Sequence, residues 1–325
     1  PDDMYDELYD PSLRQEYNLN ISGATEKSTF FASLGLLDNT GITDGSDMQR
    51  WTARLRGDYQ AKKWLKVGAN MNYTRFEWNG ASSANEGDGS TADVFSAVAN
   101  TAPIYPVYIR DEFGNKIKDK YGWPIYDTGD GRYHGVMSAS PSQSNPLQLI
   151  WLDQSYSEGN AFGVNGFADF KLYRDLTVTI NGGMNLDETR TTDVRNPYYG
   201  QFATEGGLIS KGHSRLFSYN FQQLINYTHT FGTQHNLDVL LGHENYVRHS
   251  YSLGASKSGM FSADNDELYG AVVDKSSAYS AHSSYNNEGY FLRAQYNFDE
   301  RVYVSASYRR DASSRFHPKH RWGNF

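Results

Sequence analysis

The chain has 325 residues, a formal net charge of −8, no cysteine and 25 tyrosines, and 38% of its residues are hydrophobic. It contains no apolar run of the roughly 20 residues that a membrane-spanning helix needs, so a membrane role would require strands. The acidic balance lacks the clustered Lys and Arg of nucleic-acid-binding proteins, and the lack of cysteine excludes disulfides and thiol chemistry.

Alternation of apolar and polar residues with a period of two predicts about ten β-strands. In one of them Leu176, Val178 and Ile180 share a face, and Thr177 and Thr179 share the other. The same pattern predicts strands, in chain order, at residues 14–23, 28–37, 50–60, 64–76, 160–172, 176–187, 215–231, 235–249, 288–298 and 301–311.

The connections between these strands alternate between short and long. The short ones lie at 23–27, 61–64, 173–175, 231–234 and 299–300, and the long ones at about 38–49, 77–159, 188–214 and 250–287. Bacterial outer-membrane barrels have short periplasmic turns and long extracellular loops, whereas a soluble sandwich has no reason to sort loop lengths by end. The sequence therefore predicts an all-β fold, part of a transmembrane antiparallel β-barrel, with residues 1–325 in one barrel domain.

Polar residues of these strands would line the lumen of such a barrel. Alternation directs Arg54, Arg56 and Asp58 to this side, together with Asn70 and Asn72 of the next strand. Buried charges need partners, so we expect these side chains to bind whatever fills the lumen.

The connection at 77–159 is the strongest candidate for ligand recognition, because structureless loops of this length are usually functional. Residues 91–100 predict a short helix with Thr91 as N-cap. Exposed aromatic rings can stack on sugars or grip peptide side chains; alternatively they pack the loop on itself or against a partner subunit. The candidate substrate-binding residues are Trp78, Tyr105, Tyr108, Tyr121, Trp123 and Tyr126.

Motifs for catalysis or cofactor binding are not found, whether a P-loop, GxSxG, HExxH or a GxGxxG after a strand. The histidine pairs His243/His249 and His317/His320 fall short of the four ligands of a structural metal site. The carboxylate groups Asp264/Asp266/Glu267 and Asp127/Asp130 lack the spacing of an EF-hand. We therefore expect no catalytic residue, no metal and no cofactor.

Seven segments share a recognisable pattern in one order along the chain. They are YNLNISGATEKSTFFASLGLLDNTGI at 17–42, RWTARLRGDYQAKKWLKVGANMNYT at 50–74, TAPIYPVY at 101–108, the turn DEFGN at 111–115, YDTGDG at 126–131, GYFLRAQYNFDERVYVSASYRRDASSRF at 289–316 and RWGNF at 321–325. These segments resemble the SusC/RagA family of TonB-dependent outer-membrane transporters. The resemblance covers nearly the whole chain.

The resemblance implies a larger, 22-stranded barrel closed by a plug domain in the bacterial outer membrane. It implies active import of oligosaccharides or peptides, driven through the TonB complex and assisted by a SusD-like surface lipoprotein. A dimer of transporter–lipoprotein pairs is compatible with it. No plug domain and no TonB-contacting segment is visible, so we expect this chain to be an internal portion of the barrel whose lumenal residues contact plug or substrate.

Two other classes of function remain open on the sequence. A soluble or surface-attached, aromatic-rich β protein that binds polysaccharide would need polar outward faces, which the apolar alternation does not provide. An outer-membrane enzyme would need a convergent nucleophile or acid–base set, and a purely structural barrel would need no lipoprotein partner.

Overall fold

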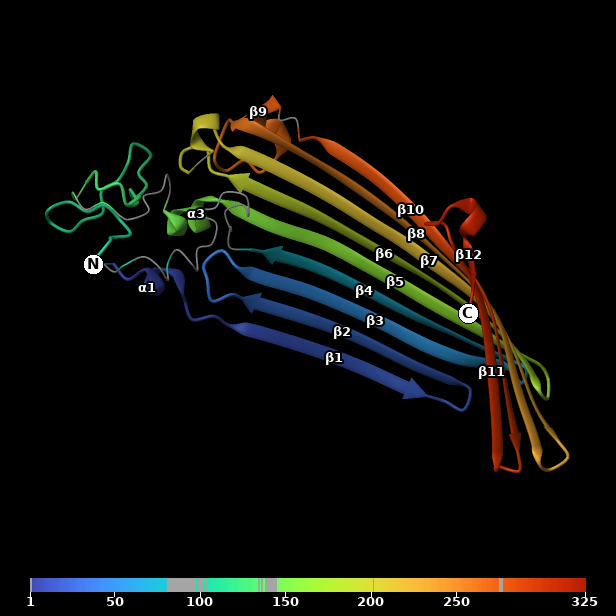
Figure 1. Cartoon of the computed structure of the whole chain (residues 1–325). Helices are drawn as coiled ribbons and strands as arrows, with labels where there is room; N and C mark the ends of the chain where they lie inside the picture. Colours follow the sequence, from blue (N-terminus) through green and yellow to red (C-terminus); the bar gives the residue numbers. More distant parts are fainter. Residues whose placement is uncertain are drawn as a thin grey trace.

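A single antiparallel sheet, curved along its strands, makes up most of the molecule (Figure 1). The computed structural model describes residues 2–80, 98, 102, 104–133, 135, 137, 145–200, 202–274 and 277–325. Its strands are β1 (Arg14–Ala24), β2 (Ser28–Thr40), β3 (Asp47–Lys62), β4 (Leu65–Asn79), β5 (Gln154–Tyr173), β6 (Leu176–Arg195), β7 (Leu208–Phe231), β8 (His235–Met260), β9 (Ala271–Asp274), β10 (Tyr279–Phe298), β11 (Val302–Ser313) and β12 (Trp322–Asn324).

Helical segments are short and lie outside the sheet. They are the α-helices α1 (Met4–Leu8) and α3 (Pro146–Leu152) and the 3-10 turns η1 (Ala203–Glu205), η2 (Leu268–Gly270) and η3 (Pro318–His320). No helix in the described parts of the chain is long and apolar enough to cross a membrane.

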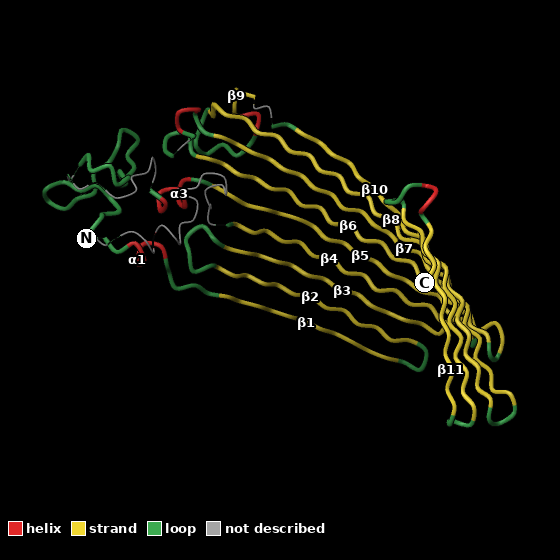
Figure 2. The backbone as a smooth tube through the Cα atoms, in the orientation of Figure 1, coloured by secondary structure: helices red, strands yellow, loops and turns green. Residues whose placement is uncertain are grey.

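Strands that follow one another in the chain are neighbours in the sheet, apart from β9, which pairs with β8 beside the main path. In this meander, the short connections lie at one end of the sheet and the long connections at the other. The turns after β1, β3, β5, β7 and β10 gather at one end of the sheet, and the longer connections with α1, α3, η1 and η2 lie at the other (Figure 2). We refer to these as the short-turn end and the long-loop end.

The two faces of the sheet differ in chemistry. Register places Leu19, Leu34 and Ala53 beside one another on one face, in line with Tyr73 of β4. Leu19 is 70% exposed, Leu34 62% and Leu55 56%, although each is apolar. Contiguous exposed apolar surface of this kind marks a face that meets lipid or a partner rather than water. We call it the apolar face, and it includes Leu19, Ile21, Leu34, Leu55, Met71, Tyr73, Val164, Val178, Ile180, Met184 and Leu241.

The opposite face, which we call the polar face, carries hydrogen-bonding side chains. One row of paired residues crosses it through Arg56, Asn70, Asn165, Gly183 and Asn220. The side-chain period of a strand is two residues, so this separation of apolar and polar residues fixes the register of the whole sheet.

All ten predicted strands are confirmed, and β9 and β12 are additional. The strands continue further toward the long-loop end than alternation indicated, so the long connections between the ten strands span 41–46, 80–153, 196–207 and 261–278, the last of which contains β9. The reason is visible on the apolar face near that end, where Arg75 and Arg190 approach Glu158 at 3.7 and 3.0 Å. Where both faces of a strand carry polar residues, alternation disappears although the hydrogen-bonded ladder continues.

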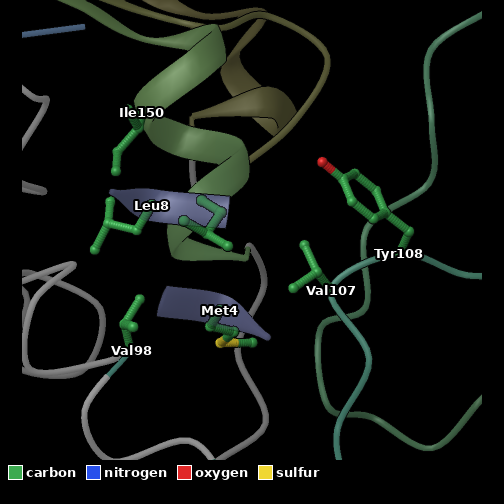
Figure 3. Packing of buried hydrophobic residues seen from close by; sticks show 7 residues of the cluster. Met4, Leu8, Val98, Val107, Tyr108 and Ile150 are labelled. Carbon is green, nitrogen blue, oxygen red and sulfur yellow. The ribbon is translucent and has the colours of Figure 1, made fainter. Parts of the chain in front are cut away.

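The helix predicted at 91–100 lies outside the described residues, apart from Val98, which is helical and buried. A one-layer sheet has no interior, so the buried apolar residues gather at the long-loop end (Figure 3). The larger cluster consists of Met4, Leu8, Val98, Val107, Tyr108, Leu147 and Ile150, and a smaller one of Val194, Ile209 and Ala271.

Candidate binding site: the loop platform and the polar face

An eight-residue repeat organises the described part of the long β4–β5 connection. The sequences DEFGNKI and DKYGWPI begin at Asp111 and Asp119, and each places a glycine in the fourth position. Gly114 and Gly122 have φ of +84° and +88°, a conformation that glycine adopts without the penalty of a side chain. Only the first turn was predicted from the sequence; the repeated spacing of Asp, aromatic residue and Gly was the signal for the second.

Each turn is held by its leading aspartate. Asp119 Oδ1 accepts hydrogen bonds from the backbone N–H of Tyr121 at 2.8 Å and of Trp123 at 2.9 Å, and Asp111 does the same for residues 113 and 115. The Asn115 side-chain amide also donates to Asp111 at 3.1 Å; this hydrogen bond is the largest influence that lowers the pKa of Asp111, followed by the backbone N–H of Asn115. Each aspartate therefore acts as a local cap on its turn, as in an Asx turn.

We expect Asp119→Ala to loosen the second turn by about 0.5–2 kcal/mol, the usual cost of losing a side-chain cap. Hydrogen exchange should accelerate at the Tyr121 and Trp123 amides and stay unchanged in the first turn. Asp111→Ala is the matched control and should give the reverse pattern. Unchanged exchange in both turns would show that the backbone hydrogen bonds hold them alone.

The repeat is anchored to the N-terminal segment. Asp2 Oδ2 accepts from the backbone N–H of Val107 at 3.0 Å, and Asp2 Oδ1 pairs with Arg110 at 2.6 Å. Tyr108 donates to Glu7 at 3.0 Å, and its ring packs in the cluster that contains Leu8 (Figure 3). Partial burial raises the pKa of Asp2, but these hydrogen bonds outweigh it and hold the pKa below its usual value.

The same connection is tied to neighbouring loops. The Trp151 indole donates to Asp44 in the β2–β3 connection at 2.8 Å, and Tyr156 donates to Asp266 beyond β8 at 2.6 Å. A buried ion pair adds to these contacts, because the Asp153 carboxylate binds Arg195 at 3.1 Å. We call the described residues 104–133, α1, α3 and the 196–207 connection the loop platform.

The Asp153–Arg195 pair is buried on both sides, and Asp153 also accepts from the backbone N–H of Asn196 at 2.8 Å. Burial is the largest influence on this carboxyl group and raises its pKa, although Asn196 and Arg195 act in the opposite direction. This pair was not predicted from the sequence, because residues 42 positions apart give no local pattern.

Three of the six aromatic candidates pack within the platform or at its edge. Tyr108 is 5% exposed, and its ring stacks on Trp151 and lies 5.0 Å from Tyr126. Burial raises the pKa of both tyrosines, that of Tyr126 to about 12. Tyr105 is half-buried and donates to the carbonyl oxygen of Met137 at 3.3 Å. Tyr108 and Tyr126 therefore stabilise the loop, which was the alternative role considered for these aromatic residues.

The other three candidates lie nearer the surface. Tyr121 is exposed, and its ring centroid is 4.4 Å from that of Tyr198; the half-buried Trp123 lies 5.9 Å from Tyr199. These four rings join the β4–β5 and β6–β7 connections into one aromatic surface. Trp78 is exposed on β4, separate from this surface, and lies on the polar face close to the long-loop end.

The five lumenal candidates share the polar face, as alternation predicted. Arg54 pairs in register with Asn72, and Arg56 with Asn70. Asp58 pairs with Lys66 at 3.2 Å and accepts a hydrogen bond from Thr29 on β2.

The histidine and carboxylate groups considered as metal ligands are distributed over the sheet and the loops. Within the described parts of the chain, no three His, Asp or Glu side chains converge as a metal site requires. His243 instead binds Gln223 and Glu288 through its two ring nitrogens.

No family model matches the chain. It is 25% identical to TonB-dependent receptor P39 of Formosa agariphila and 24% identical to TonB-dependent receptor SusC of Bacteroides thetaiotaomicron, each over 99% of this chain. Those matches cover 28% and 31% of the relatives, so the chain spans less than a third of their length.

The solved structures give the same picture of the fold. The RagAB peptide transporter matches 99% of this chain with a TM-score of 0.76 at 24% identity, and the match covers 34% of that chain. The ferripyoverdine receptor of Pseudomonas aeruginosa matches 92% with a TM-score of 0.54 at 11% identity. In sequence and in fold, the chain is therefore similar to a stretch of the barrel of SusC- and RagA-like TonB-dependent receptors.

Proposed function

We propose that this chain forms part of the wall of a TonB-dependent importer in the bacterial outer membrane. The observation that carries the proposal is the separation of the sheet into an apolar face with exposed Leu19, Leu34 and Leu55 and a polar face with Arg54 and Asn72. A barrel wall needs this arrangement, because one face meets lipid and the other meets a plugged or water-filled lumen.

The cargo in this proposal is an oligosaccharide or a peptide. Energy reaches the transporter through the TonB complex, which acts on parts outside this chain, and the chain itself carries out no reaction. The long-loop end is then extracellular, and the loop platform lies where a SusD-like lipoprotein lid would close over the cargo. The similarity to RagAB and SusC supports this assignment. Pairs of such transporter–lipoprotein units are a further part of the proposal.

A soluble, polysaccharide-binding β protein is the alternative. It would expose polar side chains on both faces of its sheet, because water would surround both. The apolar face is the observation against it, since it extends over at least nine strands from β1 to β10 in register.

Recognition at the loop platform can be tested through Trp123. We expect Trp123→Ala in the full-length transporter to weaken cargo capture or lipoprotein association by about threefold to tenfold, the loss typical of one aromatic contact. The barrel should still assemble, because the substitution removes a loop side chain and no strand hydrogen bond. Uptake and lipoprotein co-purification measure the effect, and heat-modifiable gel mobility measures folding.

Tyr173→Ala is the matched control, because Tyr173 is an exposed aromatic residue at the short-turn end. It should leave capture and association unchanged. If Trp123→Ala also leaves both unchanged, its role is packing against Tyr198 and Tyr199. If it prevents assembly, the platform is a folding element and our assignment of recognition to it is wrong.

A further inference from the structure

Two neighbouring arginines on the polar face have no carboxylate partner. Arg54 and Arg56 are consecutive inward positions of β3, and both are exposed. Among the described residues no Asp or Glu oxygen lies within ion-pair distance of either guanidinium. Asp58, the next residue on this face, is paired with Lys66 at 3.2 Å, and Arg56 acts on it only from beyond ion-pair distance.

Two arginines at the other side of the sheet, on the same face, do have carboxylate partners. Arg309 of β11 binds both Glu244 and Asp311, the latter at 2.7 Å. Arg293 of β10 lies 3.7 Å from Asp238. The wall therefore neutralises some of its arginines internally and leaves Arg54 and Arg56 available for another anion.

The surroundings of the two arginines add further hydrogen-bond donors. Asn72 and Asn70 lie opposite them on β4, and Ser33 lies opposite Arg54 on β2. An open groove of about 880 Å³ is lined by both arginines and both asparagines, together with Ser22, Ala24, Thr29, Phe31 and Thr74. Guanidinium groups in a fork geometry bind carboxylate, sulfate or phosphate oxygens in preference to neutral groups.

A tract of asparagine and glycine continues from the arginines across β4 to β7. Gly163 lies between Asn72 and Asn185 in register, and Gly183 lies between Asn165 and Asn220. A Cβ atom at Gly163 would come within 2.6 Å of the Asn72 amide oxygen and 2.9 Å of the Asn185 amide oxygen, so a side chain there would displace both amides. At Gly183 the corresponding distances to Asn165 and Asn220 are 2.2 and 2.6 Å.

Because the two glycines carry no side chain, the side chains of the neighbouring asparagines approach each other over the glycine backbone. The asparagine amides donate and accept, so they suit the hydroxyl or amide groups of an extended polymer. Neighbouring strands are spaced by about 4.8 Å, so the tract offers hydrogen bonds at several successive points along such a polymer.

We infer that Arg54 and Arg56 form a binding site for the anionic groups of the cargo, with the asparagine–glycine tract holding the units that follow. The cargo is then an oligomer that bears carboxylate or sulfate groups. The inference rests on the proposed function and specifies its substrate class. An acidic side chain from another segment in the lumen could supply the same chemistry. Cargo is favoured because the donors continue over several strands, which one side chain cannot use.

The test is a depletion experiment with the full-length transporter in its native host. Cells receive a mixture of neutral malto-oligosaccharides, oligogalacturonates, sulfated oligosaccharides and a protein digest, and mass spectrometry follows each species in the medium. A transporter deletion strain defines which depletion depends on the protein. The variants are Arg54→Gln/Arg56→Gln and Arg54→Lys/Arg56→Lys. The charge-matched control is Lys63→Gln/Arg174→Gln, which removes two exposed cations from the short turns.

We expect the glutamine variant to lower uptake of carboxylate- or sulfate-bearing species at least about tenfold, as loss of charge-assisted hydrogen bonds implies. Neutral species should stay within about twofold, the lysine variant should retain part of the uptake, and the control should match the wild type. An equal loss of neutral and anionic species in an assembled barrel would overturn the inference and indicate a role toward another protein segment. No loss in any species would overturn it as well. If the deletion strain depletes every species to the same extent as the wild type, both the inference and the proposed import function are contradicted.

Discussion

Val164→Arg is expected to destabilise the full-length barrel by about 2–4 kcal/mol, the cost of a cation on the lipid face near the membrane midplane. Val164 lies midway along β5 on the apolar face, between Met71 of β4 and Met184 of β6. The guanidinium would have no water and no carboxylate beside it. Urea unfolding of the protein in detergent or lipid measures the free energy of unfolding.

The adjacent Asn165→Arg is the matched control, because it adds the same side chain at the same depth on the polar face. Asn165 is exposed and pairs with Asn70 and Gly183. This variant should cost well under half as much as Val164→Arg. Equal costs for the two variants would contradict the assignment of the two faces.

Asp153→Ala is expected to have a larger local effect, about 3–5 kcal/mol on the opening of the loop platform, because it removes one partner of a buried ion pair. Arg195 loses its carboxylate, and the backbone N–H of Asn196 loses its acceptor. Hydrogen exchange in peptides covering 145–160 and 190–207 measures this opening. The strands below the platform should exchange as in the wild type.

Asp153→Asn separates charge from hydrogen bonding. The asparagine amide oxygen can still accept hydrogen bonds from Arg195 and from the backbone N–H of Asn196, so this variant should cost much less than alanine. Ser155→Ala, which removes a hydrogen bond to Asp193 of 2.7 Å, controls for general effects at the start of β5. If alanine and asparagine are equally mild, the ion pair does not hold the platform.

The strands were predictable because one physical rule controls them. A residue such as Leu55 must face the apolar side, and its neighbours Arg54 and Arg56 must then face the other, so period-two alternation fixed both face and register. This rule no longer predicts a strand where the apolar face gives way to polar residues. Near the long-loop end, Glu158 and Arg190 occupy positions of the apolar face that apolar residues occupy elsewhere in the same strands. Alternation is lost there, so the sequence did not predict a strand at 154–159, although these residues belong to β5.

The aromatic candidates were predictable as a group and not as individuals. Tyr108 and Trp123 belong to the same aromatic-rich connection, yet Tyr108 is covered by α1 and α3 whereas Trp123 lies beside Tyr199 at the surface. This difference depends on contacts between segments roughly 75–105 residues apart, which no local pattern encodes. Both turns of the repeat at Asp111 and Asp119 could be predicted from the sequence, because capping by aspartate and the positive φ of glycine are local effects.

The most direct test of the two-faced wall is site-directed spin labelling along β4 of the full-length protein in lipid. The chain has no cysteine, so single cysteines from Val67 to Thr74 introduce labels without background from this part of the protein. The account predicts high oxygen and low aqueous-relaxant accessibility at residues 67, 69, 71 and 73, and the reverse at 68, 70, 72 and 74. Equal accessibility of both sets to the aqueous relaxant would contradict a membrane-spanning wall.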